Sequence, residues 1–286
     1  MAASPETRAC AAREAGDRPP AAVELRDVTA ARNGPPIWSG ANVRIEQGEF
    51  VAVLGPNGAG KSTLLDLLLG LLAPRTGTVS VLGGSPGAHG AEVGYLPQRH
   101  AFDATTRIRG VDIVRLGIDG TRFGLPLPWR TEPRERVREV IELVGATEYA
   151  GRPIGECSGG EQQRLLIART LISSPRLLLL DEPLDSLDLP NQSAVAALVD
   201  RIRRQQRITV LLVAHDVNPL LPYADRVVYV AGGRVLAGLP NEVITSETLS
   251  ALYQAPVEVL RTSDGRLVVV GQPEAPAHHS DRHEHP

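Results

Sequence analysis

The sequence predicts an α/β fold with a mostly parallel central sheet. Short apolar runs typical of buried strands alternate along the chain with segments of helical periodicity. One such run ends in a glycine-rich loop that leads into a leucine-rich helix, and another ends in two adjacent acidic residues. Parallel strands deliver such loops and acids to one edge of a sheet, where open α/β folds bind ligands.

The first half of the chain supplies a strand, a loop and a helix in succession. Residues 23–28 alternate apolar and polar side chains, as a half-buried strand does. Residues 50–54 form a fully apolar run that predicts a buried strand. The segment that starts at Ser62 is almost entirely leucine, which predicts a helix buried on most sides.

The second half repeats the alternation. Apolar residues at positions 137, 140, 141 and 144 predict an amphipathic helix over 134–144, closed by Gly145. Apolar runs at 177–180 and 209–214 predict buried strands, with a helical stripe at 195–202 between them. Asp264 and Gly265 separate two short runs and predict a hairpin.

The glycine-rich loop fits the pattern G-x-x-x-x-G-K-[ST] of the P-loop. Its predicted nucleotide-binding residues are Gly55, Pro56, Asn57, Gly58, Ala59, Gly60, Lys61, Ser62 and Thr63. Backbone amides of such a loop hold phosphates at a helix N-terminus, the lysine reaches the β- and γ-phosphates, and Ser62 binds Mg²⁺. Lys61 is the one lysine in the chain, and its compact ammonium suits this position better than the planar fork of an arginine.

The acidic pair Asp181-Glu182 directly follows the apolar run 177–180. At the carboxyl end of a parallel strand, Asp181 is placed to bind Mg²⁺, and Glu182 to polarise the water that attacks the γ-phosphate. The alternative, an ordinary strand followed by an acidic turn, is weak beside a P-loop in the same chain.

Further motifs resemble those of ATP-binding cassette (ABC) ATPases. The segment Cys157-Ser158-Gly159-Gly160-Glu161 resembles the signature motif of that family. Elsewhere Gln98 matches the Q-loop, Asp188 the D-loop and His215 the switch histidine. The resemblance covers residues 21–240.

This resemblance implies a P-loop NTPase domain of ABC type, with a mostly parallel core sheet, an antiparallel β subdomain and an inserted helical subdomain at about 99–170. Around it, 1–20 would be a disordered N-terminal segment, 241–271 a C-terminal extension with the hairpin, and 272–286 a His-rich disordered tail.

The resemblance also implies ATP and Mg²⁺ as cofactors and a head-to-tail dimer with a second copy of the chain. Ser158, Gly159 and Gly160 would bind the γ-phosphate held by the partner copy, and Asp188 would link the two sites. Gln98 would contact Mg²⁺ and the attacking water, and His215 the γ-phosphate. A transmembrane permease subunit, contacted by residues 99–119, would hold the chain at the cytoplasmic face of the cell membrane, with an extracytoplasmic substrate-binding protein beyond it.

Three positions depart from the family pattern. Cys157 replaces a leucine, Glu161 replaces a glutamine, and Arg32 stands where an aromatic residue that stacks on adenine is common. A guanidinium can stack on a base, but an exposed arginine without nucleotide contact is an equal alternative.

The amino-acid sequences of several segments, among them 94–100 and 111–117, resemble those of the zinc and manganese importer branch of the family. Four histidines with neighbouring acids in the tail suit a metal such as zinc, although a polar tail without metal is an alternative. Uptake of zinc or manganese is therefore the expected function. An iron chelate, haem or an exported compound remains an alternative cargo, and a non-transport ABC ATPase is a weaker one.

Other classes fit the sequence less well. The net charge of −3 argues against a nucleic-acid partner bound by a basic patch. The lone lysine lies in the P-loop, so none is left for the base-reading motif of a GTPase. A regulatory protein that binds nucleotide without hydrolysing it stays open.

Overall fold

The computed structural model describes residues 20–98, 102–119, 132–263 and 265–270. Two segments predicted to be unstructured lie outside the described residues: 1–20, apart from its last residue, and the His-rich tail 272–286. The first residues of the predicted permease-contacting segment, 99–101, lie outside them as well. No helix within the described ranges is both long and apolar enough to cross a membrane.

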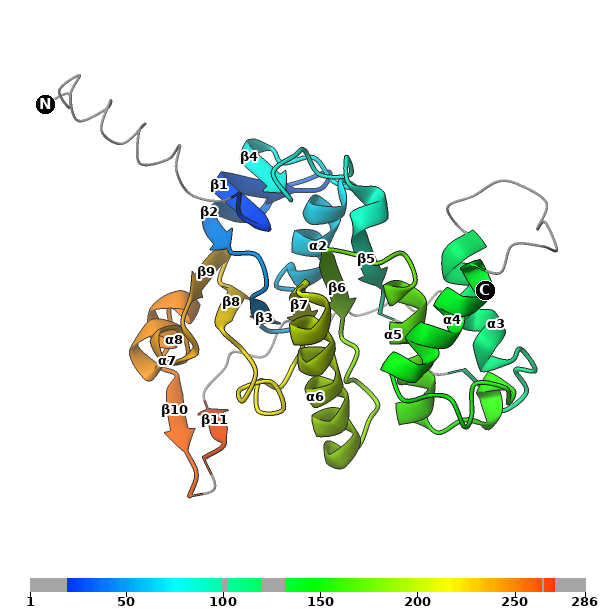
Figure 1. Cartoon of the computed structure of the whole chain (residues 1–286). Coiled ribbons are helices and arrows are strands. Elements are labelled where there is room, and N and C mark those ends of the chain that lie inside the picture. The colour runs from blue at the N-terminus through cyan, green and yellow to red at the C-terminus, as the bar shows by residue number, and fades with distance from the viewer. Residues whose placement is uncertain (1–19, 99–101, 120–131, 264, 271–286) are drawn as a thin grey trace, which may run out of the picture.

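A six-stranded sheet forms the centre of the molecule, with the strand order β5-β6-β7-β3-β8-β9 (Figure 1). The first five strands are parallel to one another, and β9 closes the sheet antiparallel to β8. In the order of the sheet, the strands are Val93–Leu96, Leu177–Asp181, Thr209–Val213, Phe50–Leu54, Arg226–Ala231 and Arg234–Gly238. The predicted parallel core is thereby confirmed.

Alternate residues of the central strands enter two different cores. On β3, Val51 and Val53 face one side, while Phe50, Ala52 and Leu54 face the other. Because both faces are covered, β3, β6 and β7 are buried at every position, which explains why their sequences are almost continuous hydrophobic runs.

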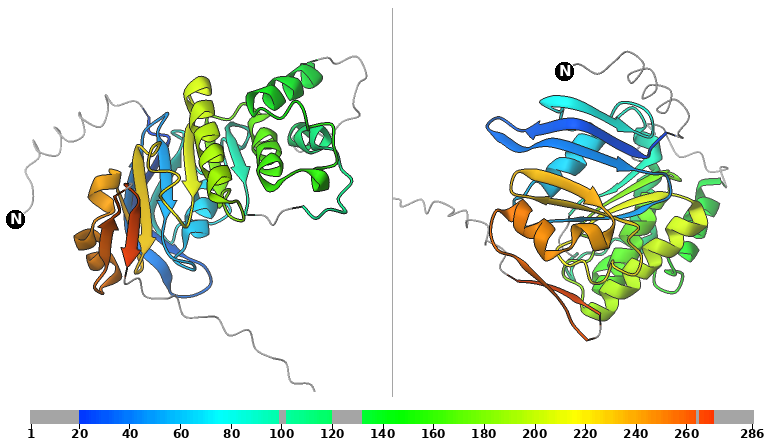
Figure 2. Two further views of the ribbon diagram at one scale, coloured as in Figure 1. Left: turned by 90° about the horizontal axis from the view of Figure 1, so that it is seen from below. Right: turned by 90° about the vertical axis from the view of Figure 1, so that its left-hand side faces the viewer.

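The first core lies between the central sheet, helix α2 (Lys61–Leu69) and a separate antiparallel sheet of order β2-β1-β4. These strands are Pro36–Ile45, Val23–Ala31 and Thr76–Val81. Figure 2 shows this sheet stacked over the central one, which is covered by helices on its opposite side. The strand predicted at 23–28 extends to Ala31 because a register shift near Asp27, at φ 49°, lets it continue past an irregularity.

The second core lies under the remaining helices. Helix α6 (Leu189–Gln206) covers the central sheet, and α3 (Gly110–Asp119), α4 (Glu132–Leu143) and α5 (Gly159–Leu171) form a group beside strand β5 (Figure 1). Short 3₁₀ turns occupy Gly90–Glu92 and Ile154–Glu156. Val137, Val140, Ile141 and Val144, the apolar residues of the predicted amphipathic helix, are buried as their spacing indicates.

The C-terminal part adds α7 (Pro240–Val243), α8 (Ser246–Tyr253) and a hairpin of β10 (Glu258–Arg261) and β11 (Leu267–Val270). In Figure 1 this hairpin extends from the β8–β9 side of the molecule. Leu267 and Val257 are buried in the second core, so the hairpin packs against the main body.

Candidate functional site

Four neighbouring strands of the central sheet place the predicted site residues at one edge. Gly55 follows β3, Asp181 ends β6, His215 follows β7 by two residues, and Gln98 follows β5 by two. The strands are adjacent and parallel, so their carboxyl ends meet. Segments 120 residues apart in sequence are thereby joined in one cleft.

The P-loop depends on glycine at positions where no side chain fits. Gly55 has φ 142°, and a Cβ there would lie 2.0 Å from the carbonyl oxygen of Val230. Gly60 has φ 101°, and a Cβ there would lie 2.6 Å from Ile37 and 2.9 Å from Trp38. Gly60 is also the N-cap of α2, so the loop delivers backbone amides directly to a helix N-terminus.

Lys61 is held inside this loop. Its Nζ donates hydrogen bonds to the carbonyl oxygens of Gly55 at 2.8 Å and Pro56 at 3.2 Å. The residue is only 5% exposed, and burial lowers the pKa of its ammonium against the opposing pull of Glu182 and Asp181. The ammonium therefore caps two loop carbonyls and sits where a phosphate would approach.

Asp181 is buried behind the P-loop. Burial, followed by repulsion from Glu182, raises the pKa of its carboxyl to about 6, while Lys61 and a hydrogen bond with Ser62 act in the opposite direction. Its Oδ1 is buried and has no hydrogen-bond partner. An orphaned carboxylate oxygen beside a serine hydroxyl is the donor set that Mg²⁺ prefers, so these residues fit a magnesium ion.

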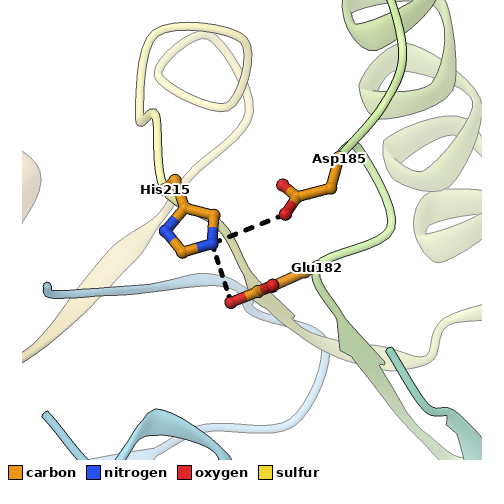
Figure 3. Close-up of side chains that lie close together, drawn as sticks. All are labelled: Glu182, Asp185 and His215. Atoms are coloured by element: carbon orange, nitrogen blue, oxygen red, sulfur yellow. Dashed lines mark ion pairs between the residues drawn. The ribbon is translucent and has the colours of Figure 1, made fainter. Parts of the chain in front are cut away.

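Glu182 lies at the centre of a polar cluster (Figure 3). Its Oε1 is 2.9 Å from His215 Nε2, and its Oε2 accepts a hydrogen bond from Gln98 Nε2. Asp185 Oδ2 lies 3.5 Å from the same His215 nitrogen. Glu182 has φ 51°, in the left-handed region that non-glycine residues rarely occupy, a form of strain found at functional sites.

These residues line an open cleft of about 550 Å³. Most of its lining was predicted from the sequence: Asn57, Gly58, Gly60, Lys61, Ser62, Thr63, Gln98, Glu182 and His215. Ile37 and Asp185 also line it and were not predicted. Asp185 was detectable in principle as a third acid after Asp181 and Glu182, separated from them by the turn at Pro183.

Arg32 pairs with Asp66 of helix α2, and its side chain is 61% exposed. It does not line the cleft among the described residues. Ile37, which does, is an apolar side chain next to the P-loop. Of the two alternatives for Arg32, this arrangement favours an exposed arginine without nucleotide contact over one that stacks on the base. Ile37 is then the candidate for contact with the base.

The signature segment forms the N-terminus of α5, away from this cleft. Ser158 is the N-cap, and its Oγ accepts from the Glu161 amide at 3.3 Å while Glu161 Oε2 accepts from the Ser158 amide at 2.8 Å. Glu161 thus completes a capping box and pairs with Arg152 at 2.8 Å. A glutamate in place of glutamine therefore suits this helix start.

Cys157 and Gly160 are set by packing. Cys157 is 6% exposed and fills a core position, as the leucine usual there would. A Cβ on Gly160 would lie 2.8 Å from Asn191 Oδ1, so glycine permits the close approach of α5 to α6. Asp188 caps α6 by accepting from the Asn191 amide at 3.0 Å.

The structure therefore gathers one set of predicted residues and leaves another apart. Residues 57, 58 and 60–63 of the P-loop line the cleft with Gln98, Glu182 and His215, and Asp181 is buried behind them. Ser158, Gly159, Gly160 and Asp188 form the other group, which is not part of the lining. Residues of this second group would contact a nucleotide only if another molecule held that nucleotide against them.

Comparison with known proteins identifies relatives along most of the chain. The family model described as ABC transporter matches residues 38–185, from strand β2 to the cleft residue Asp185. The zinc transport system ATP-binding protein TroB of Treponema pallidum is 36% identical over 81% of this chain and 86% of its own length. The manganese transport system ATP-binding protein MntB of Bacillus subtilis is 32% identical over 81% of this chain and 92% of its own.

Solved structures agree. A metal-chelate type ABC transporter in an inward-facing conformation matches with a TM-score of 0.74 at 27% identity, over 88% of this chain and 99% of that one. A dimeric ATP-binding cassette bound to ADP and phosphate matches with a TM-score of 0.61 at 26% identity, over 76% and 98% of the two chains. With the cleft geometry, these matches show that the chain belongs to the ABC transporter family as an ATP-binding subunit.

Proposed function

We propose that this chain is the ATP-hydrolysing subunit of an importer for zinc or manganese. The supporting observation is the match, at 32–36% identity over about four fifths of the chain, to proteins named for zinc or manganese transport. Such a match covers the nucleotide site and the segments around it, and does not depend on a single motif.

In the proposed reaction, the P-loop amides and Lys61 bind the β- and γ-phosphates of ATP. Lys61 exchanges its hydrogen bonds with Gly55 and Pro56 for phosphate oxygens. Ser62 and Asp181 would hold Mg²⁺, which neutralises phosphate charge when it is bound. Gln98 would be the further contact to the metal and the attacking water.

Glu182 is the proposed general base. Its carboxylate lies at the cleft wall, close to both Gln98 and His215. It would accept the proton of the attacking water as the water adds to the γ-phosphorus and the bond to the β–γ bridging oxygen breaks. His215 Nε2 would turn from Glu182 to the γ-phosphate oxygens and stabilise the charge that develops there.

The full site requires a second copy of the chain in this proposal. Ser158, Gly159 and Gly160 lie at the N-terminus of α5, where backbone amides favour an anion, yet they do not line the chain's own cleft. A head-to-tail partner would place them over the γ-phosphate, and Asp188 would lie near the junction. The cassette whose solved structure is dimeric supports this arrangement.

The remaining partners follow from the proposed transport role. A transmembrane permease subunit would conduct the metal and hold this chain at the cytoplasmic face of the membrane. An extracytoplasmic substrate-binding protein would deliver the metal to the permease. Residues 102–119, the described part of the predicted contact segment, are the proposed permease contact.

Metal uptake by cells is the direct test. A deletion strain complemented with wild-type chain should accumulate radioactive Zn²⁺ or Mn²⁺ and grow in the presence of a chelator, whereas Glu182→Gln should do neither. The purified Glu182→Gln protein should still bind ATP and form a dimer that persists, because only the proton acceptor is removed. Equal uptake of both metals by the wild-type and deletion strains would contradict the proposal.

A metal chelate is the second candidate cargo. It is favoured by the similarity in structure to a metal-chelate type transporter, which spans 88% of this chain. Uptake of a radioactive iron chelate in the same two strains separates the candidates. Dependence of chelate uptake on Glu182, with unchanged zinc and manganese uptake, would support this second cargo.

A further inference from the structure

Three side chains from two loops bring one metal-ligand atom each to a common point in the cleft. They are His215 Nε2, Glu182 Oε1 and Asp185 Oδ2, all within 4.8 Å of one another. The nitrogen lies 2.9 Å from the glutamate oxygen and 3.5 Å from the aspartate oxygen (Figure 3). ATP hydrolysis uses Glu182 and His215, but it gives no role to Asp185.

The spacing agrees with a zinc site. Zinc binds imidazole nitrogen and carboxylate oxygen at about 2.0–2.2 Å in a tetrahedron, which separates neighbouring ligand atoms by roughly 3.3 Å. The distances of 2.9 and 3.5 Å from His215 Nε2 lie on either side of this value. Both distances from the imidazole nitrogen therefore suit tetrahedral coordination, the carboxylate oxygens lie within 4.8 Å of each other, and the open cleft leaves the fourth position to water.

The charge of the nucleotide-free cleft also favours a divalent cation. Asp181, Glu182 and Asp185 carry three carboxylates close together, and Lys61 is the cation that interacts with all of them. This group bears two more negative than positive charges when all are ionised. A divalent cation would neutralise that excess negative charge.

We propose that Glu182, Asp185 and His215 bind a late first-row divalent metal, represented by Zn²⁺, when no nucleotide is bound, and that this metal competes with MgATP. The imidazole ligand selects zinc, cobalt or nickel over magnesium. A metal at this point holds His215 away from the γ-phosphate and Glu182 away from water. If the proposed import function holds, imported zinc would slow the ATP hydrolysis that drives its uptake.

Metal stoichiometry tests the site. The full chain with His278, His279, His283 and His285 replaced by alanine serves as the background, so that the tail contributes no imidazole. Equilibrium dialysis with Zn²⁺ should then give one bound ion per chain, and Co²⁺ should give the intense visible absorption of a tetrahedral site. His215→Ala in this background should weaken binding by more than about 100-fold, since loss of a second-shell partner alone costs 10–100-fold.

Two further variants guard against misfolding and distant sites. Asp185→Asn changes a side chain that is 40% exposed, so the fold should be retained, and binding should weaken at least about tenfold. His89→Ala is the matched control, because His89 pairs with Glu92 and does not line the cleft. Unchanged zinc stoichiometry in both His215→Ala and Asp185→Asn would overturn the proposal.

Competition is measured with a fluorescent ATP analogue and excess Mg²⁺. Zn²⁺ should raise the apparent Kd of the analogue at least about tenfold more in the background chain than in Asp185→Asn. Chelation of zinc by the nucleotide is the same for both proteins and cancels in this comparison. An equal shift in both would overturn competition. Because these are measurements on purified protein, their failure leaves cellular zinc and manganese uptake as a separate test of the proposed function.

Discussion

Asn218 and Leu267 exchange two hydrogen bonds. Asn218 Nδ2 donates to the Leu267 carbonyl oxygen at 3.0 Å, and the Leu267 amide donates to Asn218 Oδ1 at 2.7 Å. Asn218 lies three residues after His215, and Leu267 begins strand β11 of the C-terminal hairpin. The Asn218 amide thus pairs with the Leu267 backbone in the way that the backbone of a neighbouring strand would. It joins the hairpin to the loop that carries His215, the proposed switch histidine.

Asn218→Ala should loosen this junction. The variant loses both hydrogen bonds with Leu267 and the one that Asn218 Nδ2 donates to Asp216 Oδ1 at 2.6 Å. At about 1 kcal/mol for each, this lowers the free energy of unfolding by about 3 kcal/mol and makes the hairpin more sensitive to protease. ATPase activity should fall severalfold, because the His215 loop loses a support. Urea denaturation and limited proteolysis measure the first two effects. Asn241→Ala, at an exposed position of α7, is the control and should change none of them.

Lys61→Arg keeps the charge and changes its shape. The Lys61 ammonium fits between the carbonyl oxygens of Gly55 and Pro56 in a buried loop, and a planar guanidinium is too wide for that position. Loss of charge-assisted hydrogen bonds worth about 1.5–3 kcal/mol should lower kcat/KM for ATP by about 10- to 100-fold. Near-normal steady-state turnover would mean that charge alone suffices at this position.

Asp181→Asn should stabilise the nucleotide-free protein in a pH-dependent way. Burial raises the pKa of Asp181 to about 6 from its ordinary 3.8, so the folded chain binds more protons than the unfolded chain between these values. The free energy of unfolding contributed by this group therefore falls as pH rises through that window, and the penalty is complete above about pH 6. Asparagine removes the penalty, worth up to about 3 kcal/mol.

Urea denaturation between pH 4.5 and 8 checks this expectation. The advantage of Asp181→Asn over the wild type should be largest above pH 7 and shrink towards pH 4.5. Asp188→Asn is the control, because asparagine also caps helices well and Asp188 is exposed. MgATP should stabilise the wild type more than Asp181→Asn, since the proposed metal ligand is lost. An advantage that is constant with pH would contradict burial as its cause.

Strong local patterns carried the prediction of the fold. The buried strands β3, β6 and β7 were predictable because a strand covered on both faces is a nearly continuous apolar run, and the P-loop was predictable from its glycine pattern. Strand β8 could also have been predicted, because residues 227–231 form a similar apolar run. Strand β4 was not, because its exposed threonines and glycine acquire strand pairing only from β1.

The site was partly predictable for a similar reason. Lys61, Glu182 and His215 belong to compact segments whose residue types state their chemistry. Asp185 is close in sequence to the acidic pair, but the chain turn at Glu182 brings it into the cleft; Ile37 has no local signal and enters through the packing of β2 over the P-loop. The side chain of Arg32 is placed by its pairing with Asp66, 34 residues further along the chain. Contacts distant in sequence therefore place Ile37 and Arg32, whereas a local turn places Asp185.

Gly160→Ala should separate packing from nucleotide contact at the signature turn. The added Cβ would lie 2.8 Å from Asn191 Oδ1, so α5 or the Asn191 side chain must shift, at a cost of about 1–3 kcal/mol in the free energy of unfolding. Asn191→Ala in the same chain removes the opposing atom and should restore most of that stability. Thermal or urea denaturation of the two single variants and the double variant measures this compensation.

ATPase activity should behave differently from stability in these variants. If the Gly160 amide approaches a phosphate bound by a second copy of the chain, the Cβ also obstructs that approach, and removal of Asn191 leaves the obstruction in place. The double variant should therefore be nearly as stable as the wild type and still hydrolyse ATP slowly. Asn191→Ala alone, with Gly160 intact, is the matched control and should retain most of its activity. Activity that returns together with stability in the double variant would assign Gly160 to helix packing and remove it from the composite site.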